Sequence, residues 1–147
     1  MLVYLDSSVL ARAYLPDEDG HAAARELLDG SEHLLATASW TIVEVTSALV
    51  RAVRTGRRAE PDALLAALAA DTGDDGLVTL LRADAEQVER RAIEIVRRHA
   101  LRSLDALHLA VADLAAIPLL DAGDKLGLAS RDDAQRAAGE AMGLVPV

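Results

Sequence analysis

Short apolar runs that alternate with helical segments are the feature that most constrains the fold of this sequence. Each run is rich in Val, Leu or Ala and is bounded by turn residues, as buried strands are. Strands separated by helices pair in parallel, so the pattern predicts an α/β fold with a mainly parallel sheet. We expect strands at 2–5, 33–37, 76–81, 126–130 and, at an edge, 144–147; the expected helices are 9–15, 21–28, 40–54, 61–70, 84–99, 103–114 and 132–142.

Apolar residues in four of these helices predict how each helix packs. The helix 61–70 has little polar face, so we expect it to be well buried or covered by another chain. Ser103 is the expected N-cap of the mostly buried helix that contains Asp105. The expected inward residues are Ile42, Val45, Leu49 and Val53 in the helix 40–54, and Val88, Ala92, Ile93 and Val96 in the helix 84–99.

Length and composition limit the class of protein. The 147 residues fit a single domain, 1–147, and 52% apolar content excludes disorder as the default. Cysteine is absent, which excludes disulfides and Cys-zinc sites and favours a cytoplasmic protein. No apolar run is long enough to span a membrane, and no signal peptide opens the sequence. The net charge of −9 argues against nucleic-acid binding through a broad basic surface.

Four acids stand out by their positions. Asp6 follows the first strand, Glu44 and Asp105 lie on apolar helical segments, and Asp132 follows the strand 126–130. A carboxylate among apolar residues is costly unless it is partnered, and carboxylates that meet repel one another. A cluster of these acids must therefore hold protons, an arginine or a cation. Oxygen ligands favour Mg²⁺, with Mn²⁺ as the second possibility.

Four short segments in this order resemble a known family. They are residues 3–8, residues 42–49, residues 104–110 and Ser130-Arg131-Asp132, and they resemble the PIN domain, a metal-dependent ribonuclease fold, in particular the VapC-type toxins. The resemblance implies a three-layer sandwich with a parallel central sheet flanked by helices. It also implies catalytic roles for Asp6, Glu44, Asp105 and Asp132, with Asp6 and Asp105 as metal ligands. The stretch before Asp132 is hard to align, so Asp133, Asp124 and Asp121 remain alternatives for the fourth acid.

The resemblance implies an endoribonuclease that acts as the toxin of a toxin–antitoxin pair. The expected partners are a VapB-like antitoxin that inserts a basic side chain into the acidic site, an RNA substrate and a second copy of the chain in a homodimer. The antitoxin helix is expected along an apolar groove near residues 64–70 and the Glu44 helix. The alternative is a catalytically inactive PIN-like module that binds protein or RNA. An aspartyl-phosphate phosphatase would want an acid where Ser8 stands, and a receiver domain would want paired acids and a late lysine.

Other polar residues could support such a site. We expect Ser7, Ser8 and Ser130 to orient carboxylates or water, although helix capping competes for the first two. His108 lies one turn after Asp105, where a packed, hydrogen-bonded histidine is favoured over a metal ligand or proton-transfer group. A basic cluster at the end of the helix 40–54 is either a solvated face or a contact for RNA phosphate; it comprises Arg51, Arg54, Arg57 and Arg58.

Overall fold

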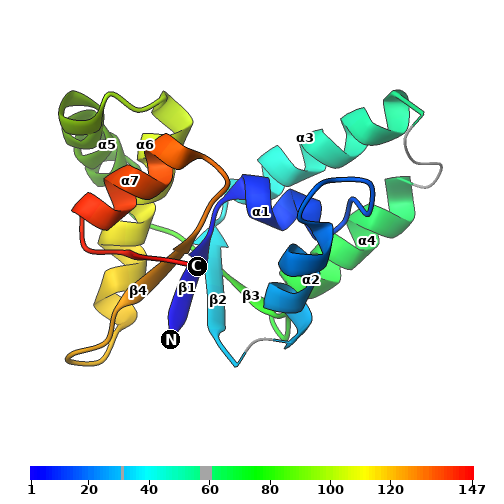
Figure 1. Ribbon diagram of the computed structural model, residues 1–147, viewed down its shortest axis with the longest axis horizontal. Coiled ribbons are helices and arrows are strands. Elements are labelled where there is room, and N and C mark those ends of the chain that lie inside the picture. Colours follow the sequence, from blue (N-terminus) through cyan, green and yellow to red (C-terminus); the bar gives the residue numbers. More distant parts are fainter. Residues whose placement is uncertain (31, 57–60) are drawn as a thin grey trace.

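The central element is a five-stranded parallel sheet. The computed structural model describes residues 1–30, 32–56 and 61–147, and all four pairs of neighbouring strands run in parallel (Figure 1). The strand order is β3-β2-β1-β4-β5, which places the first strand at the centre of the sheet. The predicted α/β class is therefore confirmed. The strands are β1 (Leu2–Leu5), β2 (Leu34–Ala38), β3 (Val78–Leu81), β4 (Leu126–Ala129) and β5 (Val145–Pro146).

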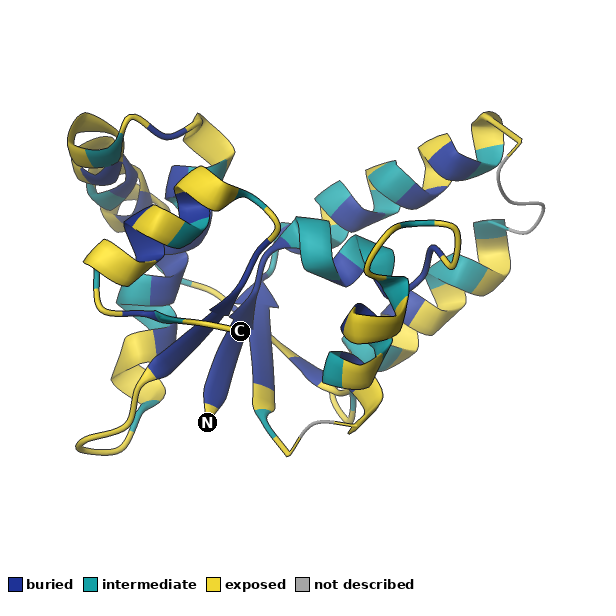
Figure 2. Ribbon diagram, in the orientation of Figure 1, coloured by how far each residue is buried: buried dark blue, intermediate teal, exposed yellow. Residues whose placement is uncertain are grey.

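Helices cover both faces of this sheet and complete the expected three-layer sandwich (Figure 1). One apolar cluster joins the first four helices to one face, and a second cluster joins the later helices to the other face. Figure 2 shows the strands buried between helices whose outer faces are exposed. The helices are α1 (Ser7–Arg12), α2 (His21–Gly30), α3 (Thr41–Arg54), α4 (Pro61–Asp71), α5 (Ala85–His99), α6 (Ser103–Val111), the π-helix η1 (Ala112–Ala116), the 3₁₀ helix η2 (Ile117–Leu119) and α7 (Asp133–Ala141).

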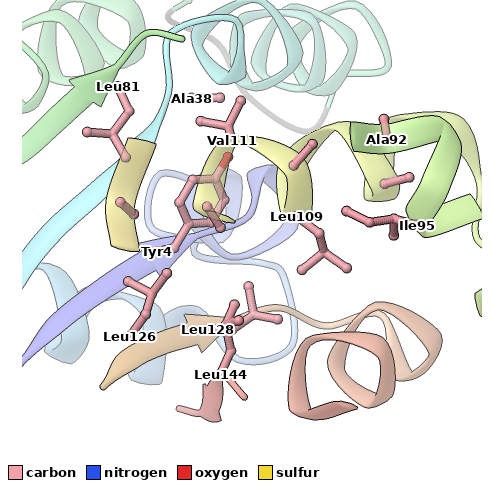
Figure 3. Packing of buried hydrophobic residues seen from close by; sticks show 14 of the residues in the cluster. Tyr4, Ala38, Leu81, Ala92, Ile95, Leu109, Val111, Leu126, Leu128 and Leu144 are labelled. Atoms are coloured by element: carbon pink, nitrogen blue, oxygen red, sulfur yellow. The ribbon is translucent and has the colours of Figure 1, made fainter. Parts of the chain in front are cut away.

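The central strand supplies residues to both apolar clusters, as the two-residue period of a strand requires. Val3 and Leu5 pack with α1–α4, whereas Leu2 and Tyr4 pack with α5, α6 and α7. Figure 3 shows the Tyr4 ring among Leu109, Val111 and the strand residues of the second cluster. Because β1 is buried on both faces, the residue that follows it emerges at the carboxyl end of the sheet between two helical layers.

Two helices bury a slightly different stripe from the one that the sequence predicts. In α5, Ile95 is buried with Val88 and Ala92, whereas Ile93 is 59% exposed and Val96 is exposed at 36%. The prediction of inward Ile93 and Val96 was wrong, because the stripe continues at positions i, i+4 and i+7. In α3, Val45 and Leu49 are buried as predicted, but Ala52 completes the stripe; Ile42 and Val53 are only half-buried.

The helix that carries Asp105 begins and ends differently from the prediction. Arg102 is the N-cap residue, without a side-chain capping bond, and Ser103 is the first helical residue. Ala106 and Leu109 are fully buried, but Leu104 is 49% exposed. Beyond Val111 the chain continues as η1 and η2, where Pro118, which has no N–H to donate, cannot prolong an α-helix.

Helix α4 is not well buried. Leu68 is its one fully buried residue, Leu64 and Leu65 are half-buried, and several of its alanines are exposed. Of the two alternatives for this apolar helix, coverage by another chain is the one that this exposure leaves open. None of the described helices is both long and apolar enough to cross a membrane.

Candidate active site

Asp6 lies at the carboxyl end of the central strand, where β2 and β4 flank β1 on either side. In an open parallel sheet this switch point is where ligands usually bind. Asp6 is 5% exposed and caps α1, with its Oδ2 accepting a hydrogen bond of 3.0 Å from the Ser8 backbone N–H. Capping and a role in a site are therefore compatible for this carboxylate, because Oδ1 is left for other contacts.

Glu44 reaches the same region from the first turn of α3. Its Oε2 lies 2.7 Å from His108 Nε2, and its Oε1 accepts a hydrogen bond of 3.3 Å from the Ser7 hydroxyl. The same His108 Nε2 lies 3.6 Å from Asp6 Oδ1. His108 is 1% exposed, so one buried ring lies beside two acids that are 38 positions apart in the sequence.

Asp105 joins these acids from the first turn of α6. Burial, followed by the charges of Asp132 and Asp6, raises the pKa of the Asp105 carboxyl above its usual range. The neighbouring side chains of Arg102 and His108 act on this pKa in the opposite direction. Asp105 is therefore close enough to feel the charges of both Asp6 and Asp132, which come from two other elements.

Among the alternatives for the fourth acid, Asp132 has the placement that suits the role. It is half-buried at the N-cap of α7, where its Oδ1 accepts a hydrogen bond of 2.9 Å from the Gln135 N–H. The Asp133 side chain is 90% exposed and pairs with Arg136. Asp121 and Asp124 precede β4, so they lie at the amino end of this strand, away from Asp6.

The predicted supporting residues are distributed around the acids. Ser7 contacts Glu44, the Ser8 N–H holds Asp6, and the Ser130 hydroxyl accepts a hydrogen bond of 3.1 Å from the Asp132 N–H. Arg51 lines a groove of about 490 Å³ that Ser7, Ser8 and Glu44 also line. Arg54 is exposed at the end of α3 and lines none of the described grooves, and Arg57 and Arg58 lie outside the described residues.

Gln135 is a site residue that the sequence did not reveal. It is fully buried, and its Nε2 donates to Asp6 Oδ1 at 3.5 Å and to the Asp105 backbone oxygen at 3.3 Å. Its Oε1 is buried without a hydrogen-bond partner among the described residues. A glutamine three positions after a helix cap is normally a surface residue, so no sequence signal marks it.

The acids are stabilised by uncharged donors. Asp6 receives the Ser8 N–H and the Gln135 amide, and Glu44 receives the Ser7 hydroxyl and faces His108. The expectation that protons, an arginine or a cation must compensate the acids is therefore incomplete, because neutral hydrogen bonds share this role. Burial and its charged neighbours also favour the protonated form of Asp105 by raising its pKa.

The donor set nevertheless suits a hard divalent cation. Among the described residues, no three His, Cys, Asp or Glu side chains are grouped closely enough to hold an ion together. The available ligand atoms are carboxylate oxygens and the unpaired Oε1 of Gln135, which are the oxygen ligands that Mg²⁺ and Mn²⁺ prefer. Asp6 and Asp105, with Asp132 beside them, are the residues that would hold such an ion.

Comparisons with known proteins agree with this geometry. The chain is similar in fold to the crystal structure of VapC20 from Mycobacterium tuberculosis, a toxin described as cleaving the sarcin–ricin loop. The TM-score is 0.68 at 21% sequence identity, over 93% of this chain and 95% of the other. No curated protein sequence gives a significant match. The family model of the PIN domain matches residues 3–134, a range that includes all four candidate acids. The chain therefore belongs to the PIN domain family.

Proposed function

We propose that the chain is a Mg²⁺- or Mn²⁺-dependent endoribonuclease that acts as the toxin of a toxin–antitoxin pair. The observation that carries the proposal is that Glu44 and Asp6 lie 2.7 and 3.6 Å from the same His108 Nε2, while the Gln135 amide lies 3.5 Å from Asp6 Oδ1 and 3.3 Å from the Asp105 backbone oxygen. Three elements thus bring carboxylates together at the carboxyl end of the central strand, where mutual repulsion has no structural benefit. This arrangement supports the enzyme over a catalytically inactive interaction module.

Each acid has a separate part in the proposed chemistry. A bound divalent ion would supply a more acidic water and neutralise charge on the scissile phosphate. Asp6 and Asp105 are the proposed ligands; Asp6 is fixed by the Ser8 N–H and the Gln135 amide. Glu44, held between Ser7 and His108, presents a carboxylate in one orientation. That fixed orientation lets its remaining lone pairs orient an attacking water or accept its proton.

A purified-protein assay tests the nuclease. We expect Asp6→Asn and Asp105→Asn to lower RNA cleavage about 10²–10⁴-fold, the range for lost acid–base or ligand groups. Asp133→Asn is the matched control, since this exposed side chain faces Arg136, and it should cleave as the wild type does. Sequencing the RNA ends made by the wild type and by Asp105→Asn would name the target and the cut. Wild-type cleavage by both Asn variants would mean that the activity comes from a contaminating nuclease. The catalytically inactive module would then be the remaining interpretation of the chain.

RNA phosphates are proposed to bind in the groove of about 490 Å³ beside Glu44. Arg51 is the described arginine in that groove, and it donates to the Ser47 hydroxyl at 2.8 Å rather than to a carboxylate. We expect Arg51→Ala to weaken RNA binding and to reduce its salt dependence, because a phosphate contact releases counterions. Arg54→Ala, which removes the same charge outside the groove, should change binding much less. Equal effects of the two variants would refute a specific contact at Arg51.

A homodimer is proposed through the apolar surface beside the acids. Exposed apolar residues on α3, α5 and α6 gather there: Val43 is 70% exposed, Ile93 59% and Leu104 49%. Val43, Leu104 and Leu107 also line a groove of about 580 Å³. We expect Ile93→Glu to dissociate the dimer in analytical ultracentrifugation. Leu119→Glu, an equally exposed residue on η2, should not dissociate it. A wild-type monomer would overturn this part of the proposal.

The antitoxin is proposed to present a basic side chain to the acids. Opposite charge would steer it to a chain of net charge −9. The Glu44 helix lines both grooves beside the acids, whereas residues 64–70 line none of the described grooves. We therefore place the partner along α3, in the cytoplasm where its RNA target would be. Expression of the wild type alone should arrest growth, whereas Asp105→Asn should not. Normal growth with active purified nuclease would refute the toxin role alone.

A further inference from the structure

A buried hydrogen-bonded chain leads from the central strand to Glu44. The Tyr4 hydroxyl lies 2.9 Å from His108 Nδ1, and His108 Nε2 lies 2.7 Å from Glu44 Oε2. Tyr4 and His108 are 0% and 1% exposed, so water does not compete for the bond between them, whereas the Glu44 end of the chain is only half-buried. The chain thus joins β1, α6 and α3, three elements that are distant in sequence.

The chemistry of the end groups fixes the direction of the chain. An ionised glutamate can only accept a hydrogen bond, so the proton in the bond to Glu44 belongs to His108 Nε2. In the tautomer with this proton on Nε2, Nδ1 is the acceptor, and the Tyr4 hydroxyl has the proton to donate to it. This tautomer satisfies both contacts at once, whereas the reverse tautomer could still bond to the Tyr4 hydroxyl but would place two acceptors, Nε2 and the carboxylate, opposite each other at Glu44.

The imidazole ring is also held by its packing. The Tyr4 ring meets it edge-on with centroids 5.9 Å apart, and the Trp40 ring lies beside it, tilted by 55°, with centroids 6.1 Å apart. The ring therefore keeps its Nε2 between two carboxylates, 2.7 Å from Glu44 and 3.6 Å from Asp6 Oδ1. Rotation of Glu44 away from this position would cost a charge-assisted hydrogen bond.

We propose that His108 is a positioning residue of the nuclease site: its Nε2–H, fixed by the Tyr4 hydroxyl, orients Glu44 and separates it from Asp6. This inference rests on the proposed nuclease function. His108 does not touch the substrate in this role, because it is buried behind the acids. It acts by limiting Glu44 to one orientation and by keeping it apart from the proposed ligand Asp6, so loss of the ring would disturb the surroundings of the ion as loss of an outer partner of a metal site does.

Three variants separate the hydrogen bonds from the packing. His108→Leu removes both bonds and keeps an apolar side chain. His108→Gln keeps an N–H that can reach Glu44, and Tyr4→Phe removes only the hydroxyl that selects the tautomer. His33→Leu is the matched control, because His33 lies at the amino end of β2, away from the acids. Far-UV circular dichroism and thermal unfolding establish which variants fold.

Two measurements do not depend on RNA cleavage. Long-range ¹H–¹⁵N spectra of the wild type, with His108 assigned by comparison with the variants, should show a proton on Nε2 and none on Nδ1. Titration with Mn²⁺ followed by electron paramagnetic resonance should show affinity reduced about 10–100-fold in His108→Leu, the usual effect of losing such a partner. His108→Gln should recover most of this affinity, and Tyr4→Phe, which keeps Glu44, should weaken the preference for the proton on Nε2.

Cleavage kinetics complete the test. His108→Leu should lower kcat about 10–100-fold with little change in KM for RNA, and His108→Gln should restore most of kcat. Any of three results would overturn the proposal. They are a proton on Nδ1 of the wild type, wild-type Mn²⁺ affinity and kcat in His108→Leu, and a folded His108→Gln variant that performs no better than His108→Leu. If His108→Leu does not fold, the ¹H–¹⁵N spectra of the wild type and of Tyr4→Phe decide whether the proposal holds. A wild type that cleaves no RNA refutes the nuclease, whereas the spectra and Mn²⁺ titration still decide the role of His108.

Discussion

Thr37 connects the two strands beside the acids, and its hydroxyl offers a test of how that edge is held. Thr37 is 0% exposed; its Oγ1 donates to the Leu5 backbone oxygen at 2.6 Å and shares a hydrogen bond of 2.8 Å with the Thr41 hydroxyl. Leu5 immediately precedes Asp6. Because a strand end is positioned by the bonds on its last residues, loss of this hydroxyl should release the backbone that carries the first acid.

Thr37→Val removes the hydroxyl and keeps the shape of the side chain. Two buried hydrogen bonds of about 0.5–1.5 kcal/mol each give a loss of about 1–3 kcal/mol. For a chain of this length, that corresponds to a fall in Tm of about 3–9 °C. Displacement of Asp6 should lower RNA cleavage as well, up to about 100-fold for a shift of about 1 Å.

Thr37→Ser is the matched control for this prediction. It keeps the hydroxyl and removes one methyl group, which costs about 1 kcal/mol in a packed interior. Differential scanning fluorimetry and single-turnover RNA cleavage measure the two properties separately. We expect the serine variant to keep wild-type cleavage despite its lower Tm. If the valine variant unfolds and cleaves as the wild type does, or if the serine variant loses as much cleavage, the reasoning is refuted.

Three further perturbations test the fold around the site. Burial and like charges raise the pKa of Asp105, so its stabilising contribution is complete below its ordinary pKa of about 3.9 and is lost as the pH rises through the raised value. The Tm of metal-free Asp105→Asn relative to the wild type should therefore rise over that pH range and then level off; a pH-independent difference would contradict this. Gly139→Ala would place a Cβ 2.5 Å from Leu128 Cδ2, and we expect a loss of about 1–3 kcal/mol in urea unfolding because this buried side chain must move; unchanged stability would mean that it moves without cost. Tyr14→Phe removes a bond of 2.8 Å to Asp71, so the free energy of unfolding should fall by about 1.5–3 kcal/mol; an unchanged value would mean that water replaces the tyrosine.

The order of strands and helices could be predicted because it depends on local patterns. Apolar runs and turn residues alternate along the chain, and every predicted strand and helix has a counterpart in the structure. The inward stripe of α5 was less predictable, since Ile93 and Ile95 are equally apolar and only the phase of the helix against the sheet chooses Ile95. Helix propensity alone does not specify how the helix is rotated about its axis relative to the sheet.

The residues of the candidate site likewise include some that could be predicted from the sequence and some that could not. The positions of Asp6, Glu44, Asp105 and Asp132 stood out because acids are unusual in apolar segments or directly after strands, and the structure brings these segments to one edge of the sheet. Among the uncharged groups around them, the serines could be predicted, but Gln135 did not stand out. Gln135 is 0% exposed only because α7 packs over Asp6 and the first turn of α6, a contact between segments about 30 and 129 positions apart.

The short last strand limits how this protein can associate with other chains. β5 contains two residues, and Pro146, which pairs with Leu128, has no N–H to offer to a further strand. That border of the sheet is a poor template for β-sheet extension, so strand-by-strand aggregation is discouraged there. Self-recognition at this side of the molecule must use side chains on helices, which can be altered by mutation without disturbing the backbone ladder.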